Sequence, residues 1–161
     1  CRGKNMDHLN RILLVEDSDI DAELTLSALK AHHLANGLVR LRDGAEALDY
    51  LCRRGQYADR AGGNPAVVLL DLKMPKVDGK EVLREMKANP KLCMIPVVIM
   101  TSSREEADVE DVYRAGANAY VVKPVDFADF VNAVDKVGGF WAIVNEPPPG
   151  TERLPTKAGV R

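Results

Sequence analysis

Short apolar runs alternate along the chain with longer stretches whose apolar residues recur at helical spacing. The short runs are rich in Val, Ile and Leu, which favours strands, at 11–15, 38–41, 66–70, 96–100 and 119–122. The longer stretches predict helices at 19–32, 45–54, 80–88 and 104–115, with a further one after Asp126. The runs AVVLL and PVVIM are apolar at every position, which is typical of strands buried on both faces.

Five successive strand–helix units predict an α/β fold, a doubly wound parallel sheet with helices on both faces. We place the folded domain at 11–145, after a flexible leader at 1–10 and before a Pro-rich, disordered tail at 146–161. Residues 140–144 prolong the last helix unless Gly138 and Gly139 end it. Ligands of such folds bind beyond the carboxyl ends of the strands, which is therefore where chemistry is expected.

Charge and composition exclude several classes of protein. The formal net charge is −2, without the basic footprint of a nucleic-acid binder. No apolar run approaches the roughly 20 residues that span a bilayer, and the first ten residues lack the apolar core of a secretory signal. The three cysteines form no CxxC pair, which favours reduced thiols and argues against a zinc site. We expect a cytoplasmic protein without nucleic-acid or membrane partners.

Polar residues follow four of the five predicted strands. Glu16 and Asp17 follow the first, Asp71 the third, Thr101 the fourth and Lys123 the fifth. Parallel strands end at one edge of a sheet, so these side chains are expected to meet. Each has an ordinary explanation alone: acids favoured at a helix N-terminus, a loop acid, a helix cap and a solvated lysine. The combination is what favours a functional site.

Three carboxylates in one crevice repel one another. Two like charges ~4 Å apart cost about 4 kcal/mol at an effective dielectric constant of about 20. Mg²⁺ removes this cost, because it binds carboxylates together with phosphate oxygens. Lys123 and Thr101 would then hold further phosphoryl oxygens, which leaves Asp71 as a nucleophile able to form an aspartyl phosphate.

The motifs ILLVEDS, LLDLKMPKVDGKEVLREMK, IPVVIMTSS and AYVVKP resemble those of two-component receiver domains, over about residues 11–141. The resemblance implies a flavodoxin-like (βα)5 fold with strand order 2-1-3-4-5. It implies that Asp71 is the phosphoacceptor and that Thr101 and Lys123 grip the phosphoryl group. The implied Mg²⁺ ligands are Glu16, Asp17, Asp71 and the backbone carbonyl of Lys73. In this family the bond that corresponds to Lys123–Pro124 is often cis.

The same resemblance assigns roles to residues near the site. Lys73 and Ser103 occupy positions that tune how fast the acyl phosphate hydrolyses, although an ordinary solvated lysine remains an alternative for Lys73. Tyr120 occupies the place of the aromatic residue that rotates inward when Thr101 is drawn to the phosphoryl group. The alternative for Tyr120 is a static, half-buried strand residue.

A finer resemblance is to the single-domain regulators paired with bacterial and cyanobacterial phytochromes. RDGAEALDYL, the long loop after it, and Phe140-Trp141 before the Pro-rich end carry it. It implies a sensor histidine kinase as phosphoryl donor and a homodimer through the last helix. Phe140 and Trp141 are interface candidates, because aromatic residues are enriched at interfaces; the alternative is that they cap the core.

Three rival functions start from the same pattern. A phosphorylation-independent docking module would keep the fold without needing Asp71. A haloacid dehalogenase-like phosphatase requires a second Asp two residues after the nucleophile, and this chain has Lys73 at that position. A flavodoxin needs a phosphate-binding loop after the first strand, and EDSDID would repel a phosphate without a metal. We expect a signalling domain, not an enzyme, that assists only its own phosphorylation and dephosphorylation.

Overall fold

The computed structural model describes residues 8–31 and 33–155. Its central sheet consists of five parallel strands. From one edge of the sheet to the other they are β3 (Leu38–Leu41), β2 (Ile12–Val15), β4 (Val67–Leu70), β5 (Val97–Thr101) and β6 (Ala119–Val122). Counted along the chain within this sheet, the order is 2-1-3-4-5, which confirms the flavodoxin-like fold expected from the sequence.

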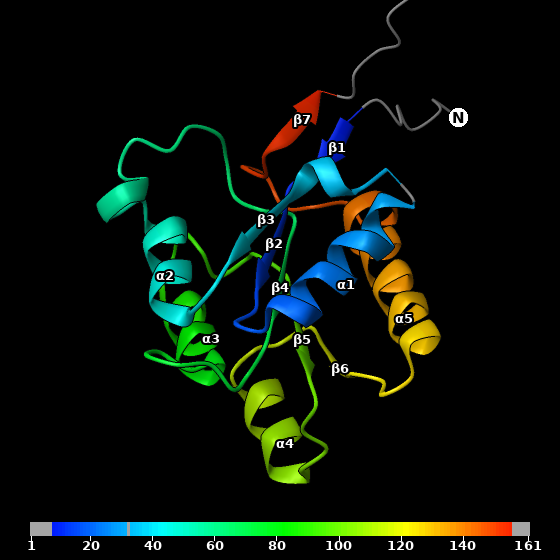
Figure 1. The fold of residues 1–161 in the computed structure, drawn as a ribbon. Helices are drawn as coiled ribbons and strands as arrows, with labels where there is room; N and C mark the ends of the chain where they lie inside the picture. Colours follow the sequence, from blue (N-terminus) through cyan, green and yellow to red (C-terminus); the bar gives the residue numbers. More distant parts are fainter. Residues whose placement is uncertain (1–7, 32, 156–161) are drawn as a thin grey trace, which may run out of the picture.

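Helices cover both faces of the sheet (Figure 1). One face carries α1 (Asp19–Lys30) and α5 (Phe127–Gly139). The other carries α2 (Gly44–Cys52), α3 (Gly79–Ala88) and α4 (Glu106–Arg114). Alternate residues of each central strand point to opposite faces, so both sides must be apolar. This explains the uninterrupted apolar runs of the three central strands, which are buried at every position.

Side-chain caps fix where four of the helices begin. Ser18, Asp43, Asp78 and Asp126 each accept a hydrogen bond from a backbone N–H in the first turn of α1, α2, α3 and α5. The cap of α4, Glu105, makes no such bond, and Val112 is the only fully buried residue of that helix. Two short 3-10 turns lie in the connections between helices and strands. The first, η1 (Ala35–Gly37), lies between α1 and β3, and the second, η2 (Gly55–Tyr57), lies between α2 and β4.

Helix α5 continues into a π-helical turn, η3 (Phe140–Val144), so the helix is prolonged past its two glycines. Gly138 is required where it lies, because a Cβ there would approach Leu29 Cδ2 to 2.6 Å. The glycine therefore lets α5 pack closely on α1. In the middle of the turn, the Ala142 carbonyl accepts a 2.9 Å hydrogen bond from the side-chain amide of the buried Asn10.

A second, two-stranded sheet pairs β1 (His8–Asn10) with β7 (Arg153–Pro155) in antiparallel orientation. It lies at the end of the molecule opposite the carboxyl ends of the parallel strands (Figure 1). This differs from the leader at 1–10 and the disordered tail at 146–161 that composition indicated. The cause is long-range pairing: Arg11 binds Glu152 over 3.2 Å, and Asn64 is bonded through its backbone to Gly150 and Glu152. Residues 1–7 and 156–161 lie outside the described residues.

Among the described helices, none combines the length and the apolar character needed to cross a bilayer.

Candidate functional site

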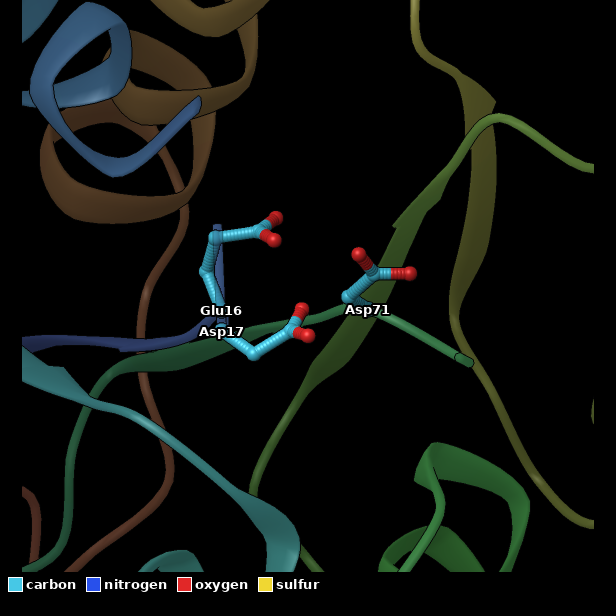
Figure 2. A group of neighbouring side chains, drawn as sticks. All are labelled: Glu16, Asp17 and Asp71. Carbon is cyan, nitrogen blue, oxygen red and sulfur yellow. The ribbon is translucent and has the colours of Figure 1, made fainter. Parts of the chain in front are cut away.

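Strands β2 and β4 place three carboxylates side by side at their carboxyl ends. Val15 and Leu70 are partners in the parallel register, and the acids follow directly. One carboxylate oxygen each of Glu16, Asp17 and Asp71 lies within 4.8 Å of the others, and Figure 2 shows the three side chains reaching into shared space. Glu16 and Asp71 are buried, whereas Asp17 is exposed. We call these three residues the acidic cluster; it opens to solvent on the side of Asp17.

The electrostatics of the acidic cluster favour the arrival of a cation. Burial raises the pKa of Glu16 from 4.5 to about 7; a hydrogen bond from Lys123 opposes this shift, and the negative charge of Asp71 adds to it. The metal-free protein thus keeps Glu16 partly protonated near neutral pH. Oxygen ligands of this kind, close together and incompletely compensated, suit a hard divalent cation.

Lys123, which follows β6, provides the positive charge at the acidic cluster. Its Nζ lies 2.6 Å from Glu16 Oε2, 2.8 Å from Asp21 Oδ2 and 3.0 Å from Asp71 Oδ2. These three contacts use all three ammonium donors. Burial alone would lower the pKa of Lys123, but the bonds to Asp21 and Glu16 and the charge of Asp71 raise it. The Lys123–Pro124 bond, often cis in the family that the sequence resembles, is trans.

A chain of hydrogen bonds runs beside the acidic cluster from β5 to β6. Thr101 is buried at the end of β5, and its hydroxyl accepts a 3.4 Å bond from the Ser103 N–H. Ser103 Oγ donates to Asp108 over 2.6 Å, and the Ser103 carbonyl accepts a 2.9 Å bond from the Tyr120 hydroxyl. Lys80 closes the set with a 2.7 Å ion pair to Asp108. The strand end that carries Thr101 is thereby linked to α3, α4 and β6.

The loop after Asp71 completes the site. The backbone N–H of Lys73 donates to Asp71 Oδ1 over 3.3 Å, while the lysine side chain is exposed. An open depression of about 370 Å³ is lined by Asp17, Lys73 and Lys80, among others. At Gly79, a Cβ would lie 2.1 Å from the Asp71 carbonyl oxygen. Only glycine lets α3 begin so close to the backbone of Asp71.

The sequence model of the response regulator receiver domain matches residues 12–135, a range that contains the whole site. The chain belongs to the response regulator receiver domain family. The family recognised from the sequence motifs is thereby confirmed.

Known receiver proteins resemble most of this chain. Response regulator Rcp1 of Synechocystis is 42% identical over 130 residues, which cover 81% of this chain and 87% of Rcp1. The crystal structure of the Mn²⁺-bound form of Rcp1 matches with a TM-score of 0.81 and 40% identity, covering 86% of this chain and 99% of that one.

Two further solved structures carry the finer resemblance. The phosphorylated cyanobacterial phytochrome response regulator RcpA is 37% identical with a TM-score of 0.81, over 86% of this chain and 98% of RcpA. The bacteriophytochrome response regulator RtBRR is 57% identical with a TM-score of 0.69, over 89% of this chain and 86% of RtBRR. These matches confirm that the chain is similar to phytochrome response regulators, as its sequence indicated.

Within this receiver domain, the structure brings four predicted site residues into direct proximity: the acidic cluster and Lys123. Thr101 lies at the end of β5, the neighbour of β4, with Ser103 and Tyr120 bonded beside it. The sequence also singled out Phe140 and Trp141, whose rings meet edge to face with centroids 5.1 Å apart. Phe140 is 48% exposed, whereas Trp141 packs against the core on the α1–α5 face.

Sequence reasoning missed Asp21, the third carboxylate bound to Lys123. Asp21 lies in the first turn of α1, where an acid is expected for the helix dipole alone. The sequence did contain one indication: EDSDID carries four acidic residues, and Lys123 follows a strand that ends at the same edge of the sheet.

Proposed function

We propose that this receiver domain is the phosphoacceptor of a two-component phosphorelay, taking a phosphoryl group onto Asp71 with the help of Mg²⁺. The observation that carries the proposal is the placement of three carboxylates and Lys123 at one edge of the sheet. Its structural relative RcpA has been crystallised in a phosphorylated form. A docking module, the alternative function, needs neither a buried acid pair nor a lysine bound to it.

The acidic cluster fits Mg²⁺. Its ligand atoms are carboxylate oxygens within 4.8 Å of one another, and Mg²⁺ prefers oxygen. The side chains of Glu16, Asp17 and Asp71, with the backbone carbonyl of Lys73, would hold the ion. The relative Rcp1 is described in a Mn²⁺-bound form. When bound, the ion supplies positive charge that offsets the charge developing on a transferring phosphoryl group.

In the transfer, a carboxylate oxygen of Asp71 attacks the phosphorus and the bond between phosphorus and the donor's histidine nitrogen breaks. The products are an acyl phosphate on Asp71 and a neutral imidazole, which takes up a proton from water as the bond breaks. Lys123 and the Thr101 hydroxyl donate hydrogen bonds to phosphoryl oxygens, while Lys73 and Ser103, beside the reacting group, tune its hydrolysis. The domain assists only its own phosphorylation and dephosphorylation, and converts no outside substrate.

The signal follows from a change at Thr101 and Tyr120. Drawing Thr101 to the phosphoryl group opens space behind it, and the Tyr120 hydroxyl leaves the Ser103 carbonyl as the ring turns inward. The face formed by α4, β6 and α5 then changes shape. NMR of the Tyr120 ring with and without acetyl phosphate tests this, and an unchanged ring environment in a fully phosphorylated sample contradicts it.

The phosphoryl donor we propose is a sensor histidine kinase of the phytochrome type, because RcpA and RtBRR are described as regulators of phytochromes. The output is altered protein association, including a homodimer through α5 and η3, in the cytoplasm. The exposed Phe140 at the end of α5 supports an interface there. A net charge of −2 gives no support to nucleic acid or membrane as partners.

Intact-protein mass spectrometry after incubation with acetyl phosphate tests the function. Asp71→Asn is compared with Asp129→Asn, which removes an exposed acid on α5. We expect a phosphate adduct on wild type and Asp129→Asn with Mg²⁺, and none on Asp71→Asn or without Mg²⁺. Failure of the wild type to form the adduct under any condition would leave the docking module as the function.

A further inference from the structure

Arg40 lies in the edge strand β3, yet its guanidinium bonds to the loop that carries two members of the acidic cluster. Nε and Nη2 lie 3.2 and 3.1 Å from the carbonyl oxygen of Glu16, and Nη2 lies 3.3 Å from that of Asp17. Nη1 reaches Asp19 Oδ1 over 2.7 Å. The arginine thus binds the main chain of the residues whose side chains face Asp71.

These bonds act where the chain leaves the sheet. The Glu16 N–H still donates to the Leu41 carbonyl of β3 over 3.0 Å, so β3 holds Glu16 through both its N–H and its C=O. Beyond that point, the side chain of Arg40 extends the hold to the Asp17 carbonyl. The guanidinium is a planar fork of fixed geometry, and here its side chain is 21% exposed. Two adjacent carbonyls held by one rigid group have little freedom to turn.

We propose that Arg40 is a positioning residue for the metal site: it fixes the backbone of Glu16 and Asp17 so that both carboxylates face Asp71 before the cation binds. The inference rests on the proposed function, because it assumes that the acidic cluster holds a divalent cation. The three carboxylates lie within 4.8 Å of one another and repel when all are ionised, so a held backbone at Glu16 and Asp17 limits how far they can turn apart. Groups that orient metal ligands in this way govern metal affinity strongly.

The direction in which cation affinity changes distinguishes a positioning role of Arg40 from an effect of its charge. Arg40 is itself a cation beside the site, so removing its charge should strengthen cation binding, whereas removing its hydrogen bonds should weaken it. Arg42 provides the matched control. Its Nη1 lies 2.8 Å from the same Asp19 oxygen, and in the described part of the chain its guanidinium makes no hydrogen bond to the Glu16 or Asp17 carbonyl.

The test measures Mn²⁺ binding to the metal-free protein by electron paramagnetic resonance of the free ion, for wild type, Arg40→Gln, Arg40→Lys and Arg42→Gln. We expect Arg40→Gln to bind about tenfold more weakly, and Arg42→Gln to bind as tightly as wild type or more tightly. Arg40→Lys should lie between, because an ammonium can still donate to one of the carbonyls. With acetyl phosphate, Arg40→Gln should need about tenfold more Mg²⁺ for half-maximal phosphorylation and keep its rate at saturating Mg²⁺.

Equal Mn²⁺ affinities of Arg40→Gln and Arg42→Gln, or tighter binding by Arg40→Gln, would overturn the inference. Thermal unfolding without metal shows whether Arg40→Gln is folded; if it is not, Arg40→Lys against Arg42→Gln decides by the same criterion. The proposed function stands or falls separately. Should wild type bind Mn²⁺ but take no phosphoryl group, the function is wrong and the Mn²⁺ comparison still decides the role of Arg40.

Discussion

Asp21 binds Lys123 from outside the acidic cluster, with Oδ2 2.8 Å from the lysine Nζ. The contact joins the first turn of α1 to the end of β6. The other two acids bound to Lys123, Glu16 and Asp71, are both proposed metal ligands. With Mg²⁺ in place they must share their oxygens, and Asp21 remains as the partner that holds the ammonium in the site.

Asp21→Asn should therefore slow phosphorylation by acetyl phosphate even at saturating Mg²⁺. We expect a loss of about tenfold, since a charge-assisted hydrogen bond contributes about 1.5 kcal/mol. The rate is measured as phosphate adduct against time by mass spectrometry. Asp19→Asn, in the same helical turn but paired with Arg40 and Arg42, is the control and should keep the saturating rate. If both variants slow phosphorylation equally, Asp21 acts only through its negative charge near the site and not through its bond to Lys123.

Metal affinity should depend on pH through Glu16. Its pKa of about 7 in the metal-free protein means that, below pH 7, the ion must displace a proton. Mn²⁺ should therefore bind more tightly as the pH rises, by about tenfold between pH 6 and pH 8. Isothermal titration calorimetry at both values measures this, and Glu16→Gln should flatten the dependence. Equal wild-type affinities at pH 6 and pH 8 would contradict it.

The ion pair between Arg11 and Glu152, which lies directly beside the β1–β7 sheet, should contribute to stability because it is mostly buried. The side chains of Arg11 and Glu152 are 17% and 15% exposed, whereas those of Arg153 and Glu146, in the same region, are 55% and 75% exposed. Glu152→Gln should lower the free energy of unfolding by about 1.5 kcal/mol, and Glu146→Gln by less than about 0.5 kcal/mol. Urea unfolding compares the two; equal effects would mean that the pair is no stronger than an exposed one.

Alanine substitutions at Phe140 and Trp141 should affect different properties, association for Phe140 and stability of the fold for Trp141. Trp141 packs against the core, so Trp141→Ala should lower the free energy of unfolding by about 3 kcal/mol. Phe140 is 48% exposed, so Phe140→Ala should keep the fold and weaken the proposed homodimer. Analytical ultracentrifugation at several concentrations gives the dimer constant, and an unchanged constant for folded Phe140→Ala would remove this residue from the interface.

Local pattern was sufficient to predict the central sheet. A strand buried on both faces must be apolar at each position, so runs such as AVVLL are visible without knowledge of their partners. The acidic cluster was also predictable. The carboxyl ends of parallel strands lie at one edge of the sheet, and carboxylates that meet there repel one another unless a cation offsets their charge. Helix ends were less predictable. We expected the second helix to extend to residue 54, but α2 ends at Cys52, because Arg53 adopts the left-handed conformation at φ 56°.

The features that pattern did not predict depend on partners distant in sequence. Glu152 is placed by Arg11, 141 residues away, within a segment whose prolines suggested disorder. Arg40 is one polar residue in the strand LVRL, and nothing in that run indicates that it reaches the loop after β2. Asp21 is indistinguishable in sequence from an acid that caps a helix dipole. Each acquires its role only from the three-dimensional neighbourhood.

The antiparallel pairing of His8 with Pro155 has a consequence for chain connectivity. The start of β1 and the end of β7 therefore lie side by side, at the end of the sheet remote from the acidic cluster (Figure 1). A short peptide joining these two positions would close the chain into a ring without crossing the carboxyl edge, and new ends could be opened in the exposed loop before β4. A circular permutant of this kind should still take up a phosphoryl group, since no step at Asp71 needs the original order of the chain.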